Sequence, residues 1–315
     1  MKNMSELFDG GTKEMQKKKK ITFYTICVTL SILAATLVFL LITVVAMFIG
    51  NSKNNDKNED DEIANIGTTE TITLDSAQIY SGHLLLLNNE HSFSGNAPVV
   101  LIKSKERPQT DASSNAYTIG QMDKFSGTEE AIDALNSMIK AFYNYSKDDN
   151  LYIANAYDTE KIDIQDAVYA SGTAFELKYF SAASVSDWSK KDSIYGVSTY
   201  NWIYNNAHKY GFVTVPGISG TDDEGNEIGS NVFRYVGIPH ASAAKAKKQS
   251  FDSYLEMLND TTPEAPLSIK ANNVRYAIYY LSASSEHKVP TEYEYSVSGN
   301  NTDGYIITVN LSKKK

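Results

Sequence analysis

The longest apolar stretch of the chain runs from Ile21 to Gly50 and contains no charged side chain. About twenty apolar residues in a helix, at a rise of about 1.5 Å each, cross a hydrocarbon core of roughly 30 Å. The pattern therefore predicts a transmembrane helix over residues 21–50. A cleaved signal peptide is the alternative, but its apolar region is normally only about 7–15 residues long. The run is longer than that and follows a polar segment, residues 1–20.

The charges on either side of this stretch predict its orientation. Lys17 to Lys20 abut it on the N-terminal side, whereas Asp56 and Glu59 follow it. The positive-inside rule then makes residues 1–20 a cytoplasmic basic tail and places the chain after the span, from residue 51, outside the cell. Residues 51–71 are polar and acidic without apolar periodicity, which is typical of a linker.

Beyond the linker, short apolar runs alternate with amphipathic segments. Thr128 can cap a helix, and Ile132, Leu135, Ile139 and Phe142 fall on one face of the segment that follows. A second helix is predicted from Thr199 to Lys209, ending at Gly211. Further helices are predicted at 241–249 and 251–258, and strands within 72–87 (Leu84 to Leu87 among them), at 151–156, 173–180, 212–215 and 232–236, and within 265–311.

These elements predict an α+β fold: a small, mostly antiparallel sheet flanked by helices and preceded by one transmembrane helix. We expect one extracytoplasmic domain over residues 72–258 and a β-rich extension over residues 259–315. The net charge of −9 argues against a nucleic-acid partner, which would require a basic patch. The only cysteine, Cys27, lies in the predicted span, so the exported part has neither a disulfide nor a thiolate metal ligand.

Several segments, in order, bring a known family to mind. They are Ile79 to Asn89, Trp202 to Phe212, Phe233-Arg234-Tyr235-Val236-Gly237 followed by His240-Ala241, and Phe251 to Leu258. In their order and spacing the chain resembles the VanY-type D-alanyl-D-alanine carboxypeptidases. These are zinc peptidases that share a core with lysostaphin-like and hedgehog domains. The resemblance implies their fold over residues 72–258.

The family's zinc motifs are altered in this sequence. The motif Ser-x-His-x-x-Gly-x-Ala-x-Asp corresponds to Ala167 through Glu176, in which Gly172 and Ala174 are kept. The resemblance therefore places Tyr169 at the histidine ligand and Glu176 at the aspartate ligand. The second motif, Glu-x-Trp-His, corresponds to residues 229–232. Gly229 takes the place of the catalytic glutamate and Val232 that of the third ligand.

These replacements predict the loss of zinc chemistry. A catalytic zinc needs about three protein ligands, but valine has no lone pair and a protonated tyrosine is a poor ligand. Without the metal, the pKa of the attacking water is not lowered to about 7. No cofactor is expected. The five histidines fall at none of the family's ligand positions, and we expect His208 and His240 on helix surfaces or near helix ends.

Recognition of a substrate also looks altered. In the family a Ser-Gly-Tyr-Arg segment supplies an arginine that binds the terminal carboxylate of the peptide, and the nearest match here ends in Asp158. Two interpretations stay open for the region. In the first, a groove binds cell-wall material without cutting it and is lined by Asp158, Tyr169, Glu176, Arg234 and Tyr235. In the second, the former site is filled in, with Val232 packed against its neighbours. For Arg234 and Tyr235 a structural role is favoured.

The leading hypothesis is a membrane-anchored, extracytoplasmic, D-alanyl-D-alanine carboxypeptidase-like protein. It would be catalytically inactive and bind a peptidoglycan stem peptide or an exported protein. Two alternatives remain. One is an active zinc D,D-carboxypeptidase with a rearranged site that uses Glu176, and the other is a structural assembly module at the cell surface.

Overall fold

The structure is a computed structural model that describes residues 64–94, 101–103, 118–119, 125–148, 150–158, 166–179, 192–216 and 230–315. All of them belong to one compact unit, Asp60–Lys315. The described ranges contain no helix long and apolar enough to cross a membrane. The predicted tail and span, together with residues 51–63 of the predicted linker, lie outside the described residues.

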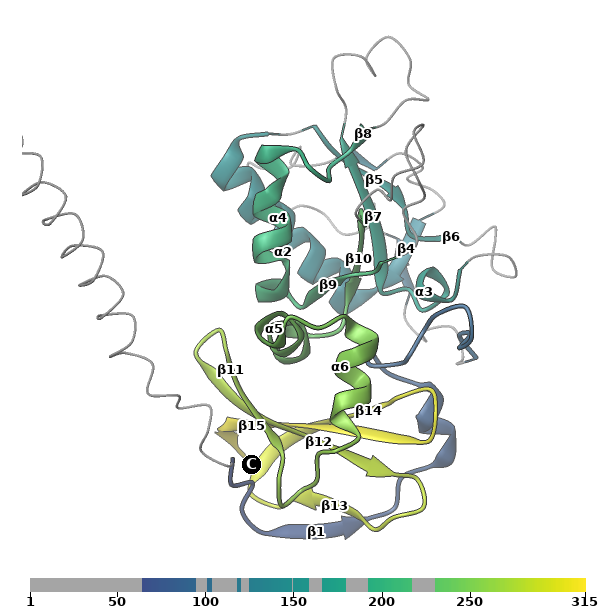
Figure 1. Cartoon of the computed structure of the whole chain (residues 1–315), viewed down its shortest axis with the longest axis vertical. Coiled ribbons are helices and arrows are strands. Elements are labelled where there is room, and N and C mark those ends of the chain that lie inside the picture. The colour runs from purple at the N-terminus through teal and green to yellow at the C-terminus, as the bar shows by residue number, and fades with distance from the viewer. Residues whose placement is uncertain are drawn as a thin grey trace, which may run out of the picture. The chain divides into compact units, whose positions relative to one another are not determined.

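The strands that were predicted between residues 151 and 236 lie in one six-stranded sheet (Figure 1). Its order is β3-β5-β7-β10-β9, with β8 paired to β7. Only the β3–β5 pairing among the described strands is parallel. The strands are β3 (Thr118–Ile119), β5 (Leu151–Asn155), β7 (Ala174–Tyr179), β8 (Asp192–Ser193), β9 (Phe212–Thr214) and β10 (Val232–Tyr235). A three-stranded sheet of β2 (Leu101–Lys103), β4 (Phe125–Thr128) and β6 (Tyr157–Asp158) accompanies it.

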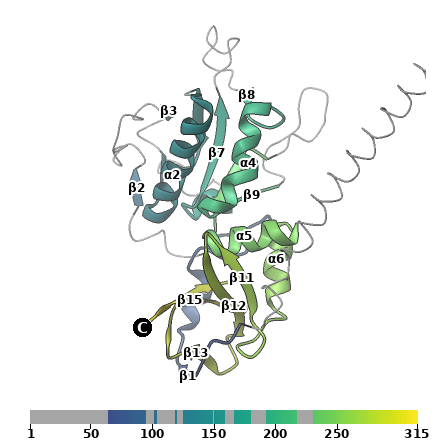
Figure 2. The same cartoon turned by 90° about the vertical axis from the view of Figure 1, so that its left-hand side faces the viewer.

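Helices α2 (Glu129–Ser146) and α4 (Asn201–Asn206) cover one face of the larger sheet (Figures 1 and 2). The predicted cap of α2 is confirmed, because the side chain of Thr128 accepts a hydrogen bond from the backbone of Ala131. The predicted apolar face of α2 is buried as well. It packs with Phe175, Leu177 and Phe233 of the sheet into the largest core cluster.

Gly211 ends the second helical segment as predicted. The segment is less regular than a single α-helix, because α4 lies between two 3-10 turns, η4 (Ser198–Tyr200) and η5 (Ala207–Tyr210). Gly211 has φ of +88°, a left-handed conformation that side chains with a Cβ rarely adopt. It turns the chain directly into β9.

A four-stranded antiparallel sheet follows, in the order β11-β12-β15-β14. Helices α5 (Ile238–Lys247) and α6 (Phe251–Leu258) pack against one face, around Ile278 and Ile306. The other face is buried by Ala64, Ile66 and the pair of β1 (Thr69–Ile72) with β13 (His287–Pro290). The four strands are β11 (Leu267–Ala271), β12 (Val274–Ser282), β14 (Tyr293–Gly299) and β15 (Gly304–Lys314).

The fold is therefore α+β with mostly antiparallel sheets, as predicted, but it has several sheets rather than one. One strand prediction is wrong. Leu84 to Leu87 form no strand after the 3-10 turn η2 (Ser76–Tyr80), although Leu84, Leu85 and Leu87 are buried. The carbonyl oxygens of Leu85 and Leu86 accept hydrogen bonds from the side chains of Arg234 and Asn301 rather than from a neighbouring strand.

Candidate functional site

Strands β7 and β10 present two chemically different faces because successive side chains alternate. Phe175, Leu177 and Phe233 belong to the core beneath α2. On the opposite face the ladder sets Val232 directly across from Glu176, and Arg234 across from Ala174. Two of the positions that the family resemblance marked as metal ligands are therefore neighbours in space.

Helix α3 (Ala167–Ala170), which was not predicted, brings the third such position to the same place. Its Tyr169 is buried and forms one apolar cluster with Val168, Ala174 and Val232. Val215 packs against this cluster from the end of β9. Tyr169, Glu176 and Val232 thus converge, as the motif alignment requires, although two of the three now belong to a small apolar core.

The hydroxyl of Tyr169 stays protonated in this setting. Burial raises its pKa well above the ordinary value near 10, and the negative charges of Glu176 and Asp166 raise it further. A hydrogen bond with Asn155 works in the opposite direction without reversing the shift. A phenol held in the neutral form is a weak metal ligand.

Glu176 is the one carboxylate at a former ligand position. Its side chain is 19% exposed, and its Oε1 lies 3.1 Å from Nζ of Lys178, two residues further along β7. The carboxylate is therefore turned toward a cation of its own strand. The described residues also hold no group of three or more histidine, cysteine, aspartate or glutamate side chains placed to share a metal ion.

The donor set does not fit a catalytic zinc. Such a site requires about three nitrogen, oxygen or sulfur donors and an open position for water. Val232 offers no donor atom, Tyr169 is buried and neutral, and Glu176 is paired with Lys178.

Arg234 lies on the same face of β10 as Val232 and is only 3% exposed. Its Nη2 donates to the carbonyl oxygens of Leu85 at 2.7 Å and of His83 at 3.1 Å. Its guanidinium carbon lies 5.2 Å from the centre of the Phe251 ring. Arg234 therefore ties the irregular segment of residues 83–87 to the sheet, which agrees with the structural role favoured from the sequence.

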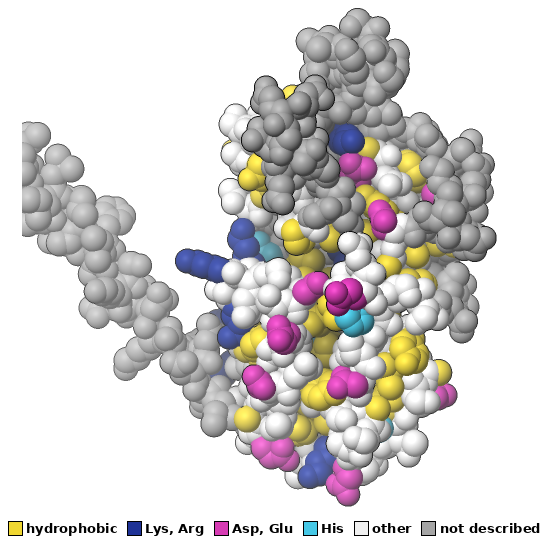
Figure 3. All heavy atoms as spheres, turned by 45° about the vertical axis from the view of Figure 1, so that its right-hand side comes forward, with side chains coloured by type: hydrophobic (Ala, Val, Ile, Leu, Met, Phe, Trp, Pro, Cys, Tyr) yellow, Lys and Arg dark blue, Asp and Glu magenta, His cyan; other side chains and the backbone are white. Residues whose placement is uncertain are grey.

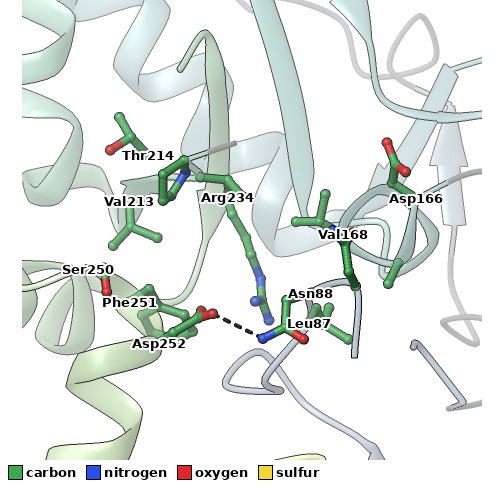
Figure 4. A pocket seen from close by; sticks show the side chains of 14 residues that line it. Leu87, Asn88, Asp166, Val168, Val213, Thr214, Arg234, Ser250, Phe251 and Asp252 are labelled. Atoms are coloured by element: carbon green, nitrogen blue, oxygen red, sulfur yellow. Dashed lines mark hydrogen bonds between the residues drawn. The ribbon is translucent and has the colours of Figure 1, made fainter. Parts of the chain in front are cut away.

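A cavity of about 210 Å³ lies beside the apolar cluster. Figure 4 shows Arg234 reaching toward it between the strands and α6, with Val168 on the far side. Leu87 and Phe251 add apolar walls, and Asn88 and Asp252 lie at its edge, joined by a hydrogen bond of 3.1 Å. Sequence reasoning missed this cavity, since it is formed by residues far apart in the chain.

The other predicted site residues lie apart from this cavity. Tyr235 points to the opposite face of β10, where its ring makes an edge contact with His83. It lines a second cavity of about 540 Å³, together with an ion pair in which His83 Nε2 lies 2.6 Å from Glu130 Oε2. Asp158 is buried on β6, opposite Phe125, and Gly229 lies outside the described residues.

The two histidines expected on or near helices differ in burial. His208 lies in η5 and is half-buried. His240 lies in the first turn of α5, near a helix end as predicted, yet it is buried rather than on a surface. Its ring nitrogens hydrogen-bond the hydroxyls of Tyr254 at 2.9 Å and Thr308 at 2.8 Å.

Comparison with known proteins agrees with the arrangement of these elements. Over 273 residues the chain is 27% identical to a D-alanyl-D-alanine carboxypeptidase of Enterococcus faecium, which covers 82% of this chain and 86% of that protein. This similarity supports the VanY/VanX-type D-alanyl-D-alanine carboxypeptidase family. The family predicted from the sequence is thus confirmed.

A solved member of this family shares the fold. It is the vancomycin-resistance D,D-dipeptidase VanXYg, in complex with a D-Ala-D-Ala phosphinate analogue. It matches with a TM-score of 0.59 and 20% identity, over 78% of this chain and 100% of that one. A VanY D,D-pentapeptidase in complex with Zn(II) gives a TM-score of only 0.34 at 16% identity, over 55% of this chain and 98% of that one. No protein-family model matches the sequence.

Proposed function

We propose that this protein is a membrane-anchored, extracytoplasmic member of the D,D-carboxypeptidase family that binds cell-wall peptide without hydrolysing it. The observation that carries the proposal is the packing of Tyr169 and Val232 in one apolar cluster at two of the three ligand positions. The scaffold that sets these positions side by side is kept, while the atoms that would hold a metal are absent from them.

The missing donors affect both halves of a hydrolytic mechanism. A metal lowers the pKa of its bound water to about 7, and a carboxylate base then removes the proton. The metal position lacks donors, and the base position is Gly229 in the sequence. Two independent changes would have to be compensated before the protein could cleave a peptide bond.

Binding requires less than catalysis. The cavity beside the cluster has both apolar walls and polar groups at its edge, as ligand sites commonly do. Apolar contacts with a short peptide and a few directed hydrogen bonds are compatible with such a lining. A stem peptide is the ligand class suggested by the family that the chain resembles.

The location of the protein is part of the proposal. Residues 21–50 form an uncharged apolar stretch that follows Lys17 to Lys20. This arrangement supports a single membrane span with a cytoplasmic N-terminus. The folded unit would then face the envelope, where stem peptides and exported proteins are found.

The test uses the full-length protein in detergent micelles, incubated with excess zinc and a stem pentapeptide that ends in D-Ala-D-Ala. We expect no D-Ala by mass spectrometry while an active family member, assayed in parallel, releases it. Release that disappears in a Glu176→Gln variant would contradict the proposal and establish an active enzyme with a rearranged site.

A second measurement separates ligand binding from a purely structural role. The full-length protein is mixed with isolated wall material, washed and recovered, with and without excess free stem peptide as competitor. Retention that the free peptide abolishes supports peptide binding. Complete loss of protein in the wash would contradict it and favour the assembly module.

A further inference from the structure

Arg234 is a buried cation that forms no ion pair among the described residues. The structure gives its guanidinium two carbonyl acceptors, both on Nη2, while its buried Nε–H has no hydrogen-bond partner in the described part of the chain. Buried charges in proteins are normally paired, since removing an ion from water is costly. Even so, the side chain remains charged at neutral pH. Burial lowers its pKa only to about 10, and the charge of Asp252 opposes that shift.

The unpaired group lies at the inner end of the 210 Å³ cavity. Leu87, Val168, Arg234 and Phe251 line it and are each buried, whereas Asn88, Thr214 and Asp252 line it and are exposed. The lining therefore passes from polar groups at the surface to an apolar base that contains one cation. Figure 4 shows the Arg234 side chain extending from β10 toward Leu87 at this base.

Acidic groups face the cavity only from its exposed edge. Asp252, in the first turn of α6, is held by Asn88, and Asp166 lies across the cavity beside Val168. Figure 3 shows a face of the molecule on which acidic side chains are spread among polar and hydrophobic ones, while Lys and Arg lie mostly toward the left edge. The carboxylates of Asp166 and Asp252 weaken the attraction between Arg234 and an anion in the cavity, and they do so more strongly for a multiply charged anion.

The geometry points to a carboxylate-binding site at the base of this cavity, in which the guanidinium of Arg234 binds the carboxylate of the ligand. Nη2 already donates to two carbonyl oxygens, so the remaining Nε–H can donate one charge-assisted hydrogen bond to an oxygen of a carboxylate. A single cation between apolar walls suits a single negative charge, whereas a phosphate would bring more charge than Arg234 can balance. This inference rests on the proposed function, because it names the group of the ligand that the protein recognises.

The size of the cavity indicates which part of a ligand enters. Ordinary small-molecule sites measure about 300–1,000 Å³, and this one is smaller, at about 210 Å³. It accommodates the end of a chain rather than a whole ligand. The free carboxyl terminus of a peptide and a small free carboxylate share the required chemistry, and the experiment below separates them.

The direct test uses the unpaired Nε–H itself. The chain has only three arginines, Arg107, Arg234 and Arg275. Arginine-selective ¹⁵N labelling of the full-length protein in micelles therefore yields three Nε–H signals, which single Arg→Lys variants at 107 and 275 assign. Acetate is titrated against acetamide, which has nearly the same shape and no charge. We expect a saturable shift of the Arg234 signal with acetate only. No saturable shift, or an equal shift with acetamide, would overturn the inference.

Two peptide arms identify the source of the carboxylate. A stem pentapeptide with a free carboxyl terminus is compared with its C-terminal amide. A shift of the Arg234 signal with the acid but not the amide supports the peptide terminus. A shift with acetate but with neither peptide supports a small free carboxylate. An equal shift with acid and amide would overturn a role for the carboxylate.

A charge variant provides a signed check that keeps Arg234 and its contacts intact. Asp252→Asn removes a negative charge near Arg234, and its matched control Asp260→Asn makes the same change in an exposed position that does not line the cavity. We expect acetate to bind about fivefold more tightly to the Asp252→Asn variant, equivalent to about 1 kcal/mol. An unchanged affinity, or an equal gain in both variants, would count against Arg234 as the partner.

The outcomes also distinguish this inference from the proposed function. Release of D-Ala in the assay above would end the non-hydrolytic proposal and leave the Arg234 titration interpretable. If the Arg234 signal does not shift with any carboxylate, this inference is wrong. Retention on wall material that free peptide abolishes would still support binding through other groups.

Discussion

Val232 and Glu176 lie directly opposite each other on adjacent strands, β10 and β7. The family resemblance places two metal ligands at these positions, and in this protein the backbone ladder sets their separation. The ladder holds the two positions side by side whichever side chains they carry. In this protein the same backbone positions Val232 against Tyr169, and the contact is apolar.

Exchanging Val232 for a polar residue of the same shape tests that contact. Val232→Thr places a hydroxyl in the cluster, and burying a hydroxyl without a partner costs about 1–3 kcal/mol. We expect the free energy of unfolding, measured with urea, to fall by that amount. The control Val215→Thr alters a side chain that is only partly buried against the same cluster, so a smaller loss is expected. Equal stability of the Val232→Thr variant and the wild type would show that the cluster is open to water.

A pair of glycine variants tests the turn into β9. Gly196 and Gly211 have φ of +77° and +88°, so an added Cβ is strained at both, by about 1–2 kcal/mol. At Gly196 the Cβ would meet no atom within 4 Å, but at Gly211 it would come within 2.7 Å of the Tyr235 ring. We expect Gly211→Ala to lower the free energy of unfolding by at least about 1 kcal/mol more than Gly196→Ala. Equal losses would contradict the close packing of Tyr235 on this turn.

His240 should make stability depend on pH. Burial, and to a lesser degree the charge of His83, lower its pKa in the folded state from 6.5 to about 3. Between these values the unfolded chain takes up a proton that the folded chain excludes. Stability is therefore complete above pH 6.5 and falls as the pH decreases toward the folded value. The loss amounts to a few kcal/mol in all, at about 1.4 kcal/mol per unit.

The measurement compares urea unfolding of the wild type and of His240→Gln between about pH 6 and pH 4. The His240→Gln variant is less stable than the wild type at neutral pH, but its glutamine side chain cannot take up a proton. The slope of its unfolding free energy against pH should therefore be smaller by about 1.4 kcal/mol per pH unit. His91→Gln, which changes a partly exposed histidine, serves as the control. An identical slope for His240→Gln and wild type would show that His240 does not carry the effect.

The regular elements were predictable because their signals are local. The cap Thr128, the apolar face of α2 and the glycine stop at Gly211 are all written within one or two turns of sequence. The convergence of Tyr169, Glu176 and Val232 was also available from the motif alignment. A fixed motif spacing implies a fixed place in the fold.

The remaining features depend on contacts between distant segments. Leu84 to Leu87 carry the pattern of a buried strand, yet their carbonyl groups are satisfied by side chains of Arg234 and Asn301. His240 is polar and lies near a helix end, but its two hydroxyl partners come from α6 and β15. Nothing next to Arg234 in the sequence shows that it is buried and forms no ion pair with the residues that the structure describes. That property, on which the carboxylate site depends, appears only in three dimensions.

If the scaffold retains the geometry of the metal site without its ligands, restoring the ligand side chains should restore zinc binding. The most direct measurement is the zinc content of the full-length protein after equilibrium dialysis against zinc. The wild type is compared with the variant Tyr169→His, Glu176→Asp, Gly229→Glu, Val232→His, and with the same variant lacking Val232→His. We expect one tightly held zinc per chain in the complete variant and none in the wild type or the incomplete one. A wild-type chain that retains one zinc, and loses it on Glu176→Gln, would contradict the account.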